Sequence, residues 1–483
     1  MSVEGLEARL DAAPPVRAVR EALRGLGGAW IVGGTVRDAL LGRPLADVDV
    51  AVAEDARGAA RAVAARAGGG PVFPLSEAFG AWRVLARDRS FSCDVSPLQG
   101  PTIAADLARR DFTVNAMAVA VAGGELLDPE GGARDLEARV LRVLGGEGGD
   151  PYAADALRPL RAARLATELG LRPDATTARL TRRFAPRVTR AAPERIWGEL
   201  RRLVLAPRVV EGVRLADDLG LVAAVLPELA ALHGLGQSTF HHLDVFEHTL
   251  EALERLLELE GSLPAVFGGL APDLAAVLAE PLGDELSRGE ALRVGVLLHD
   301  VGKPATKGVR ADGRGFSFVG HDRAGAELAH AALRRLRTSD RLASFVSDLA
   351  RHHLALGFLV HERPLSRQAV YRYLTACEPV EVEVTLLTCA DRLATRGHNA
   401  ERAIAAHLEL ARDLMGEALL WRAQGAPRPA VRGDELAEAL GLARGPELGR
   451  ILGRLKEARF TGEATERAAA LELARRISED AAS

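Results

Sequence analysis

The stretch IVGGTVRDALLGRPLADVDVAV, residues 31–52, contains the features that decide the fold of the first part of the chain. An apolar run ends at two glycines, and a second run begins with Asp47 and Asp49, one residue apart. Alternate residues of a strand point to the same face, so these two carboxylates should lie side by side. Burying such a pair without a partner would be costly. The pattern therefore predicts a strand that presents two acidic ligands to a shared partner.

A divalent cation would relieve the repulsion between Asp47 and Asp49. Mg²⁺ prefers hard oxygen ligands and is commonly held by one or two carboxylates together with substrate phosphates. A pair of such ions can stabilise the attacking and leaving oxygens of nucleotidyl transfer. Upstream, Gly33 and Gly34 leave room for a phosphate, and Arg37 can bind it through two hydrogen bonds. A lone Asp-x-Asp is usually a surface or turn feature, but with GGTVRD at this distance it predicts a phosphate and metal site.

The composition is that of a soluble globular protein, with 48% hydrophobic and 27% charged residues. A length of 483 residues suggests about three domains. The N-terminus lacks a basic start followed by an apolar run, and no uncharged stretch is long enough to span a bilayer. Three scattered cysteines, Cys93, Cys377 and Cys389, do not form a disulfide framework. We therefore expect a cytoplasmic protein with no membrane partner.

The net charge of −4 argues weakly against a nucleic-acid partner, but the average conceals a local bias. Residues 158–208 contain 13 arginines and only four acidic residues. Such a cluster is typical of a surface that faces phosphates. A solvated helix face is an equally good interpretation, because basic residues in this chain are nearly always arginine and lysine occurs only at 303, 307 and 456.

The patterns also divide the chain along its length. Residues 1–145 mix short helical patterns with strand-like runs, which predicts a domain of strands and helices. The strand-like runs are AWIVGG, DVDVAVA, WRVLAR, FSCDVS and FTVNAMAVAV. The sequence GGEGGD at 145–150 predicts a boundary, and the helical period then continues almost to the end. Breaks are expected near 233–241, 261–273, 307–317 and 423–434.

The first 230 residues hold an ordered set of motifs: GGTVRDALLG…DVD, DLARRDFTVNAMAV (106–119), LDPEGGARDLEARVLR (127–142), ADALRPLRAARLATELG (154–170) and ERIWGEL (194–200). This set resembles the bacterial (class II) tRNA nucleotidyltransferase and poly(A) polymerase family. The resemblance implies an α+β, polymerase-β-like head followed by an all-α neck, body, HD domain and tail. It implies Mg²⁺ ligation by Asp47 and Asp49, and nucleotide contacts by Gly34, Arg37 and Arg110.

Asp94, in the run FSCDVS, lies where a third carboxylate could act as a base or support a metal. Solvation of a strand end is the alternative interpretation of this residue.

Asp155 and Arg158 are candidates for base selection. On a helix, their i,i+3 spacing would put them on one face. Cytosine and adenine each present a donor beside an acceptor, so one acceptor–donor pair can select both and reject guanine and uracil. An ordinary ion pair on a helix is the alternative. The resemblance assigns the base-selecting role to these two residues and implies that Arg161 and Arg164 also contact the nucleotide.

Two departures from the family pattern bear on activity. Pro159 stands where the family usually has an aliphatic residue, and it is tolerable only if the helix begins near Asp155. The segment DVSPLQGPTIAAD, residues 94–106, is short and has no basic residue. Family members that build the entire CCA end usually carry a longer flexible segment here, so addition of CC alone is an open alternative.

Residues 248–391 contain a second constellation of histidines and aspartates, including the sequence LLHDVGKP. Imidazole and carboxylate ligands together suit Mn, Fe, Ni, Zn or Mg. The pattern resembles HD-type metal phosphohydrolases, and it implies hydrolysis of a phosphate ester by metal-activated water. A scaffold role is the alternative. The matching ligands are His248, His299, Asp300 and Asp391, with His321, His352 and His353 as the extra ligands of dinuclear members.

The sequence thus predicts four segments: a nucleotidyltransferase head (1–145), a helical neck and body that binds RNA (146–235), an HD domain (236–400) and a helical tail (401–483). The tail stretch 431–463 resembles the family's C-terminal segment. Gly445 and Pro446 would begin a helix there, and the free backbone amides at its start would bind RNA phosphate. A plain helical hairpin is the alternative.

The expected activity is addition of C and A residues to the tRNA 3′ end from CTP and ATP, with a further phosphohydrolase activity in the HD domain. CC-only addition, A-only addition and poly(A) synthesis are alternatives within the family. An HD phosphohydrolase with an RNA-binding head is the alternative from a different class of enzyme, and a non-catalytic RNA chaperone is a third.

Overall fold

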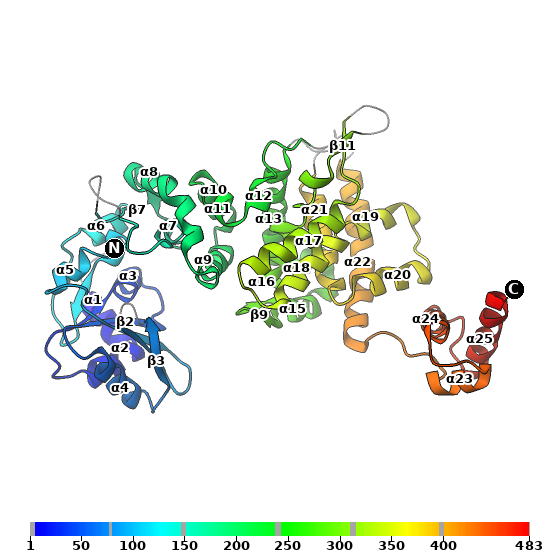
Figure 1. Cartoon of the computed structure of the whole chain (residues 1–483), viewed down its shortest axis with the longest axis horizontal. Coiled ribbons are helices and arrows are strands. Elements are labelled where there is room, and N and C mark those ends of the chain that lie inside the picture. The colour runs from blue at the N-terminus through cyan, green and yellow to red at the C-terminus, as the bar shows by residue number, and fades with distance from the viewer. Residues whose placement is uncertain are drawn as a thin grey trace. The chain divides into compact units, whose positions relative to one another are not determined.

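The computed structural model describes residues 5–76, 80–145, 151–236, 243–309, 315–395 and 400–482. Contacts divide the chain into two compact units, Met1–Val225 and Leu226–Ser483. The first contains a mixed sheet with helices, and the second is almost entirely helical (Figure 1). The expected α+β head followed by helical segments is therefore confirmed. The expected breaks at 233–241 and 307–317 fall partly, and the GGEGGD boundary mostly, outside the described residues.

A six-stranded sheet forms the centre of the first unit, in the order β3-β4-β5-β2-β1-β6. Strands β2 and β5 are parallel, and the other neighbours are antiparallel. The strands are β1 (Ala29–Val32), β2 (Asp47–Val52), β3 (Val72–Ser76), β4 (Ala81–Leu85), β5 (Ser92–Pro97) and β6 (Ala118–Ala120).

Strand β2 shows the predicted division into two faces. Val48, Val50 and Val52 are buried in the main apolar core of the unit. Asp47 and Asp49 alternate with them and therefore face the other side, where the candidate site lies. The helices α1 (Leu6–Ala12), α2 (Pro14–Ala22), α3 (Gly34–Leu40) and α4 (Ala56–Arg66) contribute apolar side chains to the same core.

Two details of the head differ from the sequence pattern. Strand β3 was not among the expected strands; it contains Pro74, which removes a hydrogen-bond donor from a sheet. The run FTVNAMAVAV was expected to be a strand, but only β6 is extended. The preceding residues form a short 3-10 turn, η1 (Thr113–Asn115), whose buried side chains serve the site.

The helical part of the first unit begins with α5 (Ile103–Leu107), α6 (Gly132–Glu137) and the short parallel pair β7 (Val140–Leu141) and β8 (Arg172–Pro173). It continues with α7 (Arg158–Leu169), α8 (Ala175–Phe184), η2 (Ala185–Arg190), α9 (Pro193–Leu205), α10 (Val209–Asp218) and α11 (Leu221–Val225). Helix α7 starts at Arg158 with Pro159 in its first turn, where proline is tolerated.

The second unit begins with α12 (Pro227–Ala230), α13 (Val245–Gly261), α14 (Leu263–Phe267), η3 (Gly268–Leu270) and α15 (Ala271–Ala279), so the break expected at 261–273 is mostly helical. A hairpin of β9 (Pro281–Gly283) and β10 (Leu286–Ser287) follows, then α16 (Arg288–Leu298), η4 (Pro304–Thr306) and a second hairpin of β11 (Gly308–Val309) and β12 (Phe316–Ser317).

Helices α17 (His321–Arg335), α18 (Asp340–His352), α19 (Ala355–Leu359), η5 (Val360–Glu362), α20 (Arg367–Cys377), α21 (Glu381–Leu393) and α22 (Ala400–Gln424) complete the body of this unit. The expected break at 423–434 separates α22 from a tail with its own small core, made of α23 (Gly433–Leu440), α24 (Pro446–Thr461) and α25 (Arg467–Ala482). Across the described ranges no single helix is long and apolar enough to cross a membrane, although the bent pair 245–261 and 263–279 passes on length and composition alone.

Candidate functional site

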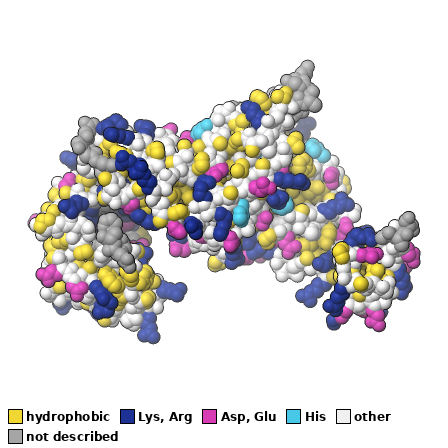
Figure 2. Space-filling view, in the orientation of Figure 1, with side chains coloured by type: hydrophobic (Ala, Val, Ile, Leu, Met, Phe, Trp, Pro, Cys, Tyr) yellow, Lys and Arg dark blue, Asp and Glu magenta, His cyan; other side chains and the backbone are white. Residues whose placement is uncertain are grey.

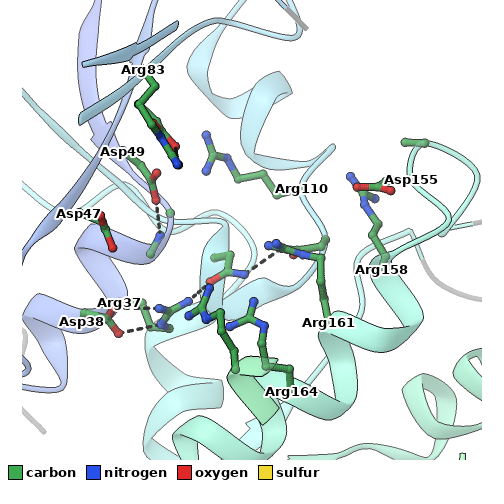
Figure 3. Close-up of a pocket in the computed structure, with 17 residues that line it drawn as sticks. Arg37, Asp38, Asp47, Asp49, Arg83, Arg110, Asp155, Arg158, Arg161 and Arg164 are labelled. Carbon is green, nitrogen blue, oxygen red and sulfur yellow. Dashed lines mark hydrogen bonds and ion pairs between the residues drawn. The ribbon is translucent and has the colours of Figure 1, made fainter. Parts of the chain in front are cut away.

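A cavity of about 490 Å³ opens on the polar face of the head sheet. In Figure 3, Asp47 and Asp49 lie on one side of this cavity, and Asp155 and Arg158 lie on the other. All ten predicted head and neck residues line the cavity: Gly34, Arg37, Asp47, Asp49, Asp94, Arg110, Asp155, Arg158, Arg161 and Arg164. The structure thus brings together side chains that are more than 100 positions apart in sequence.

The Gly33-Gly34 turn explains why glycine is needed between β1 and α3. Gly33 has φ 65°, and a Cβ built there would lie 2.7 Å from Arg110 Nη1. A Cβ on Gly34 would lie 3.2 Å from Asp49 Oδ2, the oxygen that accepts a hydrogen bond from the Gly34 amide at 3.2 Å. Side chains at these positions would fill the space between the carboxylate and the arginine.

The two carboxylates of β2 are arranged as the alternation predicts. Asp47 Oδ1 accepts a hydrogen bond of 2.5 Å from the Ser92 hydroxyl. Thr35 Oγ1 accepts a 2.7 Å hydrogen bond from the Asp49 amide and holds the strand against α3. Burial and the nearby Asp94 carboxylate raise the pKa of Asp49, against the opposing charges of arginines on the cavity wall. Two carboxylates on one face of a strand, beside a cavity, are ligands of the kind that a divalent cation prefers.

Asp94 does not lie at a strand end, so the solvation alternative is wrong. It is in register with Asp49 on the parallel neighbour and with Arg83 on the antiparallel neighbour. Arg83 Nε and Nη2 donate to the two oxygens of Asp94 at 2.7 Å each. The Asp94 carboxylate is therefore already paired with the positively charged side chain of Arg83.

The two predicted phosphate-binding arginines are each oriented by neighbouring side chains. Arg37 is buried, pairs with Asp38 at 2.9 Å and donates to Asn115 Oδ1 at 2.6 Å. Arg110 donates to Asp106 Oδ2 through Nε and Nη2 at 3.2 and 3.1 Å. Fixed guanidinium groups of this kind are suited to bind phosphate oxygens through paired hydrogen bonds.

A network of side-chain hydrogen bonds connects the head to helix α7. Asn115 accepts from Arg37 and donates to Asp111 Oδ1 at 2.9 Å. Arg161 Nε and Nη2 then donate to Asp111 Oδ2 at 2.9 and 2.6 Å. Burial alone would raise the pKa of Asp111, but the Arg161 charge and these hydrogen bonds outweigh it and hold the pKa well below its usual range.

Arg164 lies one turn further along α7. It is almost fully buried, and it pairs with Glu199 and with Glu168, the latter at 2.6 Å. Burial is the largest influence on its guanidinium and lowers the pKa of Arg164.

The expectation that Asp155 lies on a helix with Arg158 is wrong. Asp155 is in the turn before α7, where its Oδ1 accepts from the Leu157 amide at 3.0 Å. Its Oδ2 pairs with Arg195 at 2.6 Å, whereas Arg158 donates to two backbone carbonyls at 2.8 Å. The pair nevertheless reaches the same cavity, because the turn hydrogen bond from Arg158 N to Asp155 O keeps the two residues adjacent.

Sequence reasoning missed Arg83, Asp111 and Asn115. Asp111 and Asn115 stand inside the motif RRDFTVNA, and their polar character within an apolar run was the available signal. Arg83 had none, because strand register selects its partner. Arg195 was predicted only as a member of the arginine cluster, and its pairing with Asp155 was not expected.

The surface of the neck beside this cavity is basic. Exposed arginines occupy β8, α8, η2, α9 and the loop before α10: Arg172, Arg179, Arg182, Arg183, Arg190, Arg195, Arg202 and Arg208. Figure 2 shows dark-blue side chains gathered over α8. The alternative of a solvated helix face and that of a phosphate-facing surface both predict this exposure.

In the second unit, six of the seven predicted ligands come together. Two groups of three share Asp300: one with His248 and His299, and the other with His321 and His353. Asp300 Oδ1 lies 3.4 and 3.7 Å from Nε2 of His321 and His353. Asp391 closes the cluster, with its Oδ1 at 2.7 Å from His248 Nε2 and 3.7 Å from His299 Nε2.

The orientation of these rings suits a metal. Nδ1 of His299, His321 and His353 each lies 2.6–2.7 Å from a backbone carbonyl oxygen, so Nδ1 donates to that oxygen and Nε2 is the nitrogen that faces the cluster. Nε2 of His321 and His353 are only 3.1 Å apart. Burial, reinforced by the His299 charge, lowers the pKa of His353 to about 4. A cation could bind both of these nitrogens at once.

His352 does not join the cluster, so its assignment as an extra ligand is corrected. It precedes His353 on the last turn of α18, and adjacent helical residues point about 100° apart, so only one of them can face Asp300. A cavity of about 550 Å³ opens over the cluster and is lined by Asp300, Lys303, His321, His353, Asp391 and Arg392 among others. The buried His407 lies in an adjoining cavity with His353 and Asp391, and sequence reasoning missed it.

Three family models match the chain in order. Residues 29–142 match the poly A polymerase head domain, residues 170–232 match the probable RNA and SrmB-binding site of polymerase A, and residues 245–396 match the HD domain. Among solved structures, the Thermotoga maritima CCA-adding enzyme complexed with tRNA shares the fold. Its TM-score is 0.60 at 20% identity, with 99% of this chain and 98% of that chain covered.

Curated relatives are similar over nearly their whole length. The A-adding tRNA nucleotidyltransferase of Deinococcus radiodurans is 38% identical over 443 residues, which cover 90% of this chain and 92% of that protein. The CC-adding tRNA nucleotidyltransferase of Thermus thermophilus is 36% identical over 441 residues, which cover 90% of each. The Multifunctional CCA protein of Xanthomonas campestris is 32% identical over 438 residues, with 86% and 96% covered. This chain is therefore a nucleotidyltransferase and belongs to the CCA-adding family of tRNA nucleotidyltransferases.

Proposed function

We propose that the enzyme adds C and A residues to the 3′ end of tRNA, using CTP and ATP and no nucleic-acid template. The observation that carries this proposal is the single cavity lined by the two β2 carboxylates, two oriented arginines, and Asp155 with Arg158. The names of the relatives support the same chemistry. We place the reaction in the cytoplasm, which suits the three free, buried cysteines.

Family membership implies a divalent metal, and we propose that Mg²⁺ is held by Asp47 and Asp49. When bound, it would neutralise triphosphate charge and favour attack on the α-phosphorus by the tRNA 3′ oxygen. A bond forms between that oxygen and the α-phosphorus, the hydroxyl proton is lost to solvent, and the bond from the α-phosphorus to the oxygen that bridges to the β-phosphorus breaks to release pyrophosphate. Arg37 and Arg110 bind the triphosphate and stabilise the charge that develops on the leaving group.

We propose that Asp155 and Arg158 choose the base. The Asp155 carboxylate would accept from the exocyclic amino group of cytosine or adenine, and Arg158 would donate to the adjacent ring nitrogen. Guanine and uracil present the opposite order, and a bidentate base contact is worth roughly 1–3 kcal/mol of discrimination. Arg161 and Arg164 orient this edge of the cavity, and the exposed arginines of the neck would bind the tRNA backbone.

Addition of CC alone or of A alone is the second candidate. Only residues 98–102 separate β5 from α5, and this short connection is braced. The backbone N–H of Gln99 donates to Asp106 Oδ1 at 2.9 Å, and Arg109 donates to the backbone carbonyl of Gln99. A connection fixed in this way lacks the long flexible segment expected of enzymes that switch from C to A.

One assay separates these activities. The purified enzyme would be incubated with tRNA that lacks CCA and with tRNA that ends in CC, each with CTP alone, ATP alone or both. Full CCA addition predicts C incorporation into the first substrate and A incorporation into the second. Incorporation of C without A, or of A without C, would establish partial addition, and repeated A incorporation would indicate poly(A) synthesis.

For the second unit we propose a divalent metal held by His299, Asp300, His321, His353 and their neighbours, and hydrolysis of phosphate esters there. The convergence of His248, His299 and Asp300, and of Asp300, His321 and His353, with ligand atoms within 4.8 Å of one another in each group, is the observation that carries this second proposal. Metal analysis of the purified protein tests binding, and release of phosphate from phosphate esters tests hydrolysis. We also propose the four segments 1–145, 146–235, 236–400 and 401–483 as head, neck and body, HD domain and tail.

A further inference from the structure

The third carboxylate of the head cavity is held differently from the two beside it. Asp47 accepts a hydrogen bond from a serine hydroxyl at 2.5 Å, and Asp49 accepts one from a backbone amide at 3.2 Å. Both oxygens of Asp94 instead accept from the guanidinium of Arg83, at 2.7 Å each. A bidentate pair between two charged groups is among the strongest polar contacts in proteins.

The register of the sheet fixes this arrangement. Arg83 is directly opposite Asp94 on the antiparallel pair β4-β5, and Asp49 is opposite Asp94 on the parallel pair β2-β5. The three side chains therefore form a row across neighbouring strands, and all of them line the cavity. In Figure 3 the Arg83 side chain descends toward Asp49. Because the backbone sets the positions, the pair is organised before any ligand arrives.

Three carboxylates so close together could in principle attract two divalent ions. Arg83 already supplies one positive charge at Asp94, and an ion that used Asp94 would have to displace a bidentate contact. Asp47 and Asp49 have no such competitor at contact distance among the hydrogen bonds and ion pairs of the described residues. The negative charge of Asp94 is thus neutralised by Arg83, whereas Asp47 and Asp49 have no cation in direct contact among these interactions.

We propose that Arg83 is a positioning residue that takes the place of a second cation at Asp94 and directs the incoming divalent ion to Asp47 and Asp49. This inference rests on the proposed function of those two carboxylates. Asp94 then acts as the anchor of Arg83 rather than as a metal ligand. Removal of Arg83 would expose a third acidic ligand and make the head bind divalent ions more tightly, because affinity rises with the number of charged ligands.

Iron-directed cleavage of the full-length protein tests the proposal without measuring activity. Fe²⁺ replaces Mg²⁺, and with ascorbate and peroxide it cuts the backbone near the bound ion. Fragment lengths distinguish cuts in the head from cuts at the histidine cluster of the second unit. For Arg83→Gln we expect the half-maximal Fe²⁺ concentration for head cleavage to fall by about tenfold or more, with new cuts around β5.

Two further variants serve as controls for charge and for fold. Arg83→Lys keeps the positive charge beside Asp94, so its cleavage curve should return toward that of the wild type. Arg66→Gln removes another head arginine, one that pairs with Glu21, and should leave the curve unchanged. Thermal melting of each variant shows that the head is folded under the conditions of the assay.

The outcomes separate this inference from the function on which it rests. If Asp49→Asn abolishes head cleavage but Arg83→Gln gives the wild-type curve and cuts, the role of Arg83 is wrong and the metal site stands. If the wild-type head is not cut, or is still cut in Asp49→Asn, the proposed metal site itself fails.

Discussion

Replacing Arg161 by methionine should destabilise the first unit at neutral pH. Asp111 Oδ2 accepts both of its hydrogen bonds from Arg161, at 2.9 and 2.6 Å, whereas Oδ1 keeps donors from the Phe112 amide and Asn115. The variant therefore leaves one oxygen of a buried carboxylate unpaired. Breaking a buried pair in this way costs roughly 3–5 kcal/mol, and we expect about 3 kcal/mol because Arg161 is about one-third exposed.

The pH dependence gives this prediction its sign. The pKa of Asp111 is lowered in the folded protein, so the pair stabilises the fold above the unfolded-state pKa and loses that effect as the pH falls through the folded pKa. In Arg161→Met the unpaired carboxyl can escape its charge by protonation in mild acid. The difference in unfolding free energy between wild type and variant should therefore be largest at pH 7–8 and should become smaller as the pH approaches about 4.

Urea unfolding followed by tryptophan fluorescence measures the effect. Trp30, Trp82 and Trp197 lie in the first unit, so three of the four tryptophans report on it. Arg208→Met is the matched control, because Arg208 and Glu211 form an exposed pair and should contribute less than about 1 kcal/mol. A loss of unfolding free energy no larger than that of the control, or one that is equal at pH 5 and pH 8, would show that the Arg161–Asp111 pair does not stabilise the folded unit.

Three other predictions follow from the structure. Gly33→Ala should lower kcat/KM for nucleotide incorporation about tenfold or more. The new Cβ would lie 2.7 Å from Arg110 Nη1, and the φ of 65° at this position is unfavourable for alanine. Steady-state kinetics that match the wild type would contradict this. Burial raises the pKa of Glu381 to about 7, so its ionisation destabilises the folded protein as the pH rises. Glu381→Gln should therefore stabilise the protein above pH 7, by at most about 3 kcal/mol, but not at pH 4. Equal melting temperatures of variant and wild type at pH 8.5 would count against this. His321→Ala should reduce divalent metal bound at the histidine cluster, measured by metal analysis, while C incorporation into tRNA stays unchanged; undiminished metal content would show that the cluster does not hold the ion.

Much of the head site could be predicted because its signals are local. The alternation in DVDVAV places Asp47 and Asp49 on one face, and steric limits restrict the preceding turn to glycine. Arg37 and Arg110 stand within motifs whose order identified the family. These features need no knowledge of which strands become neighbours.

The remaining features depend on contacts between distant segments. The partner of Asp94 is set by the register of β4 on β5, and nothing in the sequence near Arg83 specifies that register. Asp155 was assigned to a helix from its spacing, but Pro159 fixes the start of α7 and leaves Asp155 in the turn before it. His352 and His353 could not be separated by sequence, because the phase of the last helical turn decides which ring faces the cluster.

If Asp47 and Asp49 hold the ion needed for nucleotidyl transfer, removing their charges should abolish the reaction. The most direct measurement is the single-turnover rate of C incorporation into tRNA lacking CCA, compared between the wild type and the Asp47→Asn/Asp49→Asn variant. We expect the rate of the variant to fall about a thousandfold or more while its melting temperature is unchanged, since this substitution removes the metal's contribution to the transition state. A folded variant that still incorporates C within about tenfold of the wild-type rate would contradict the account.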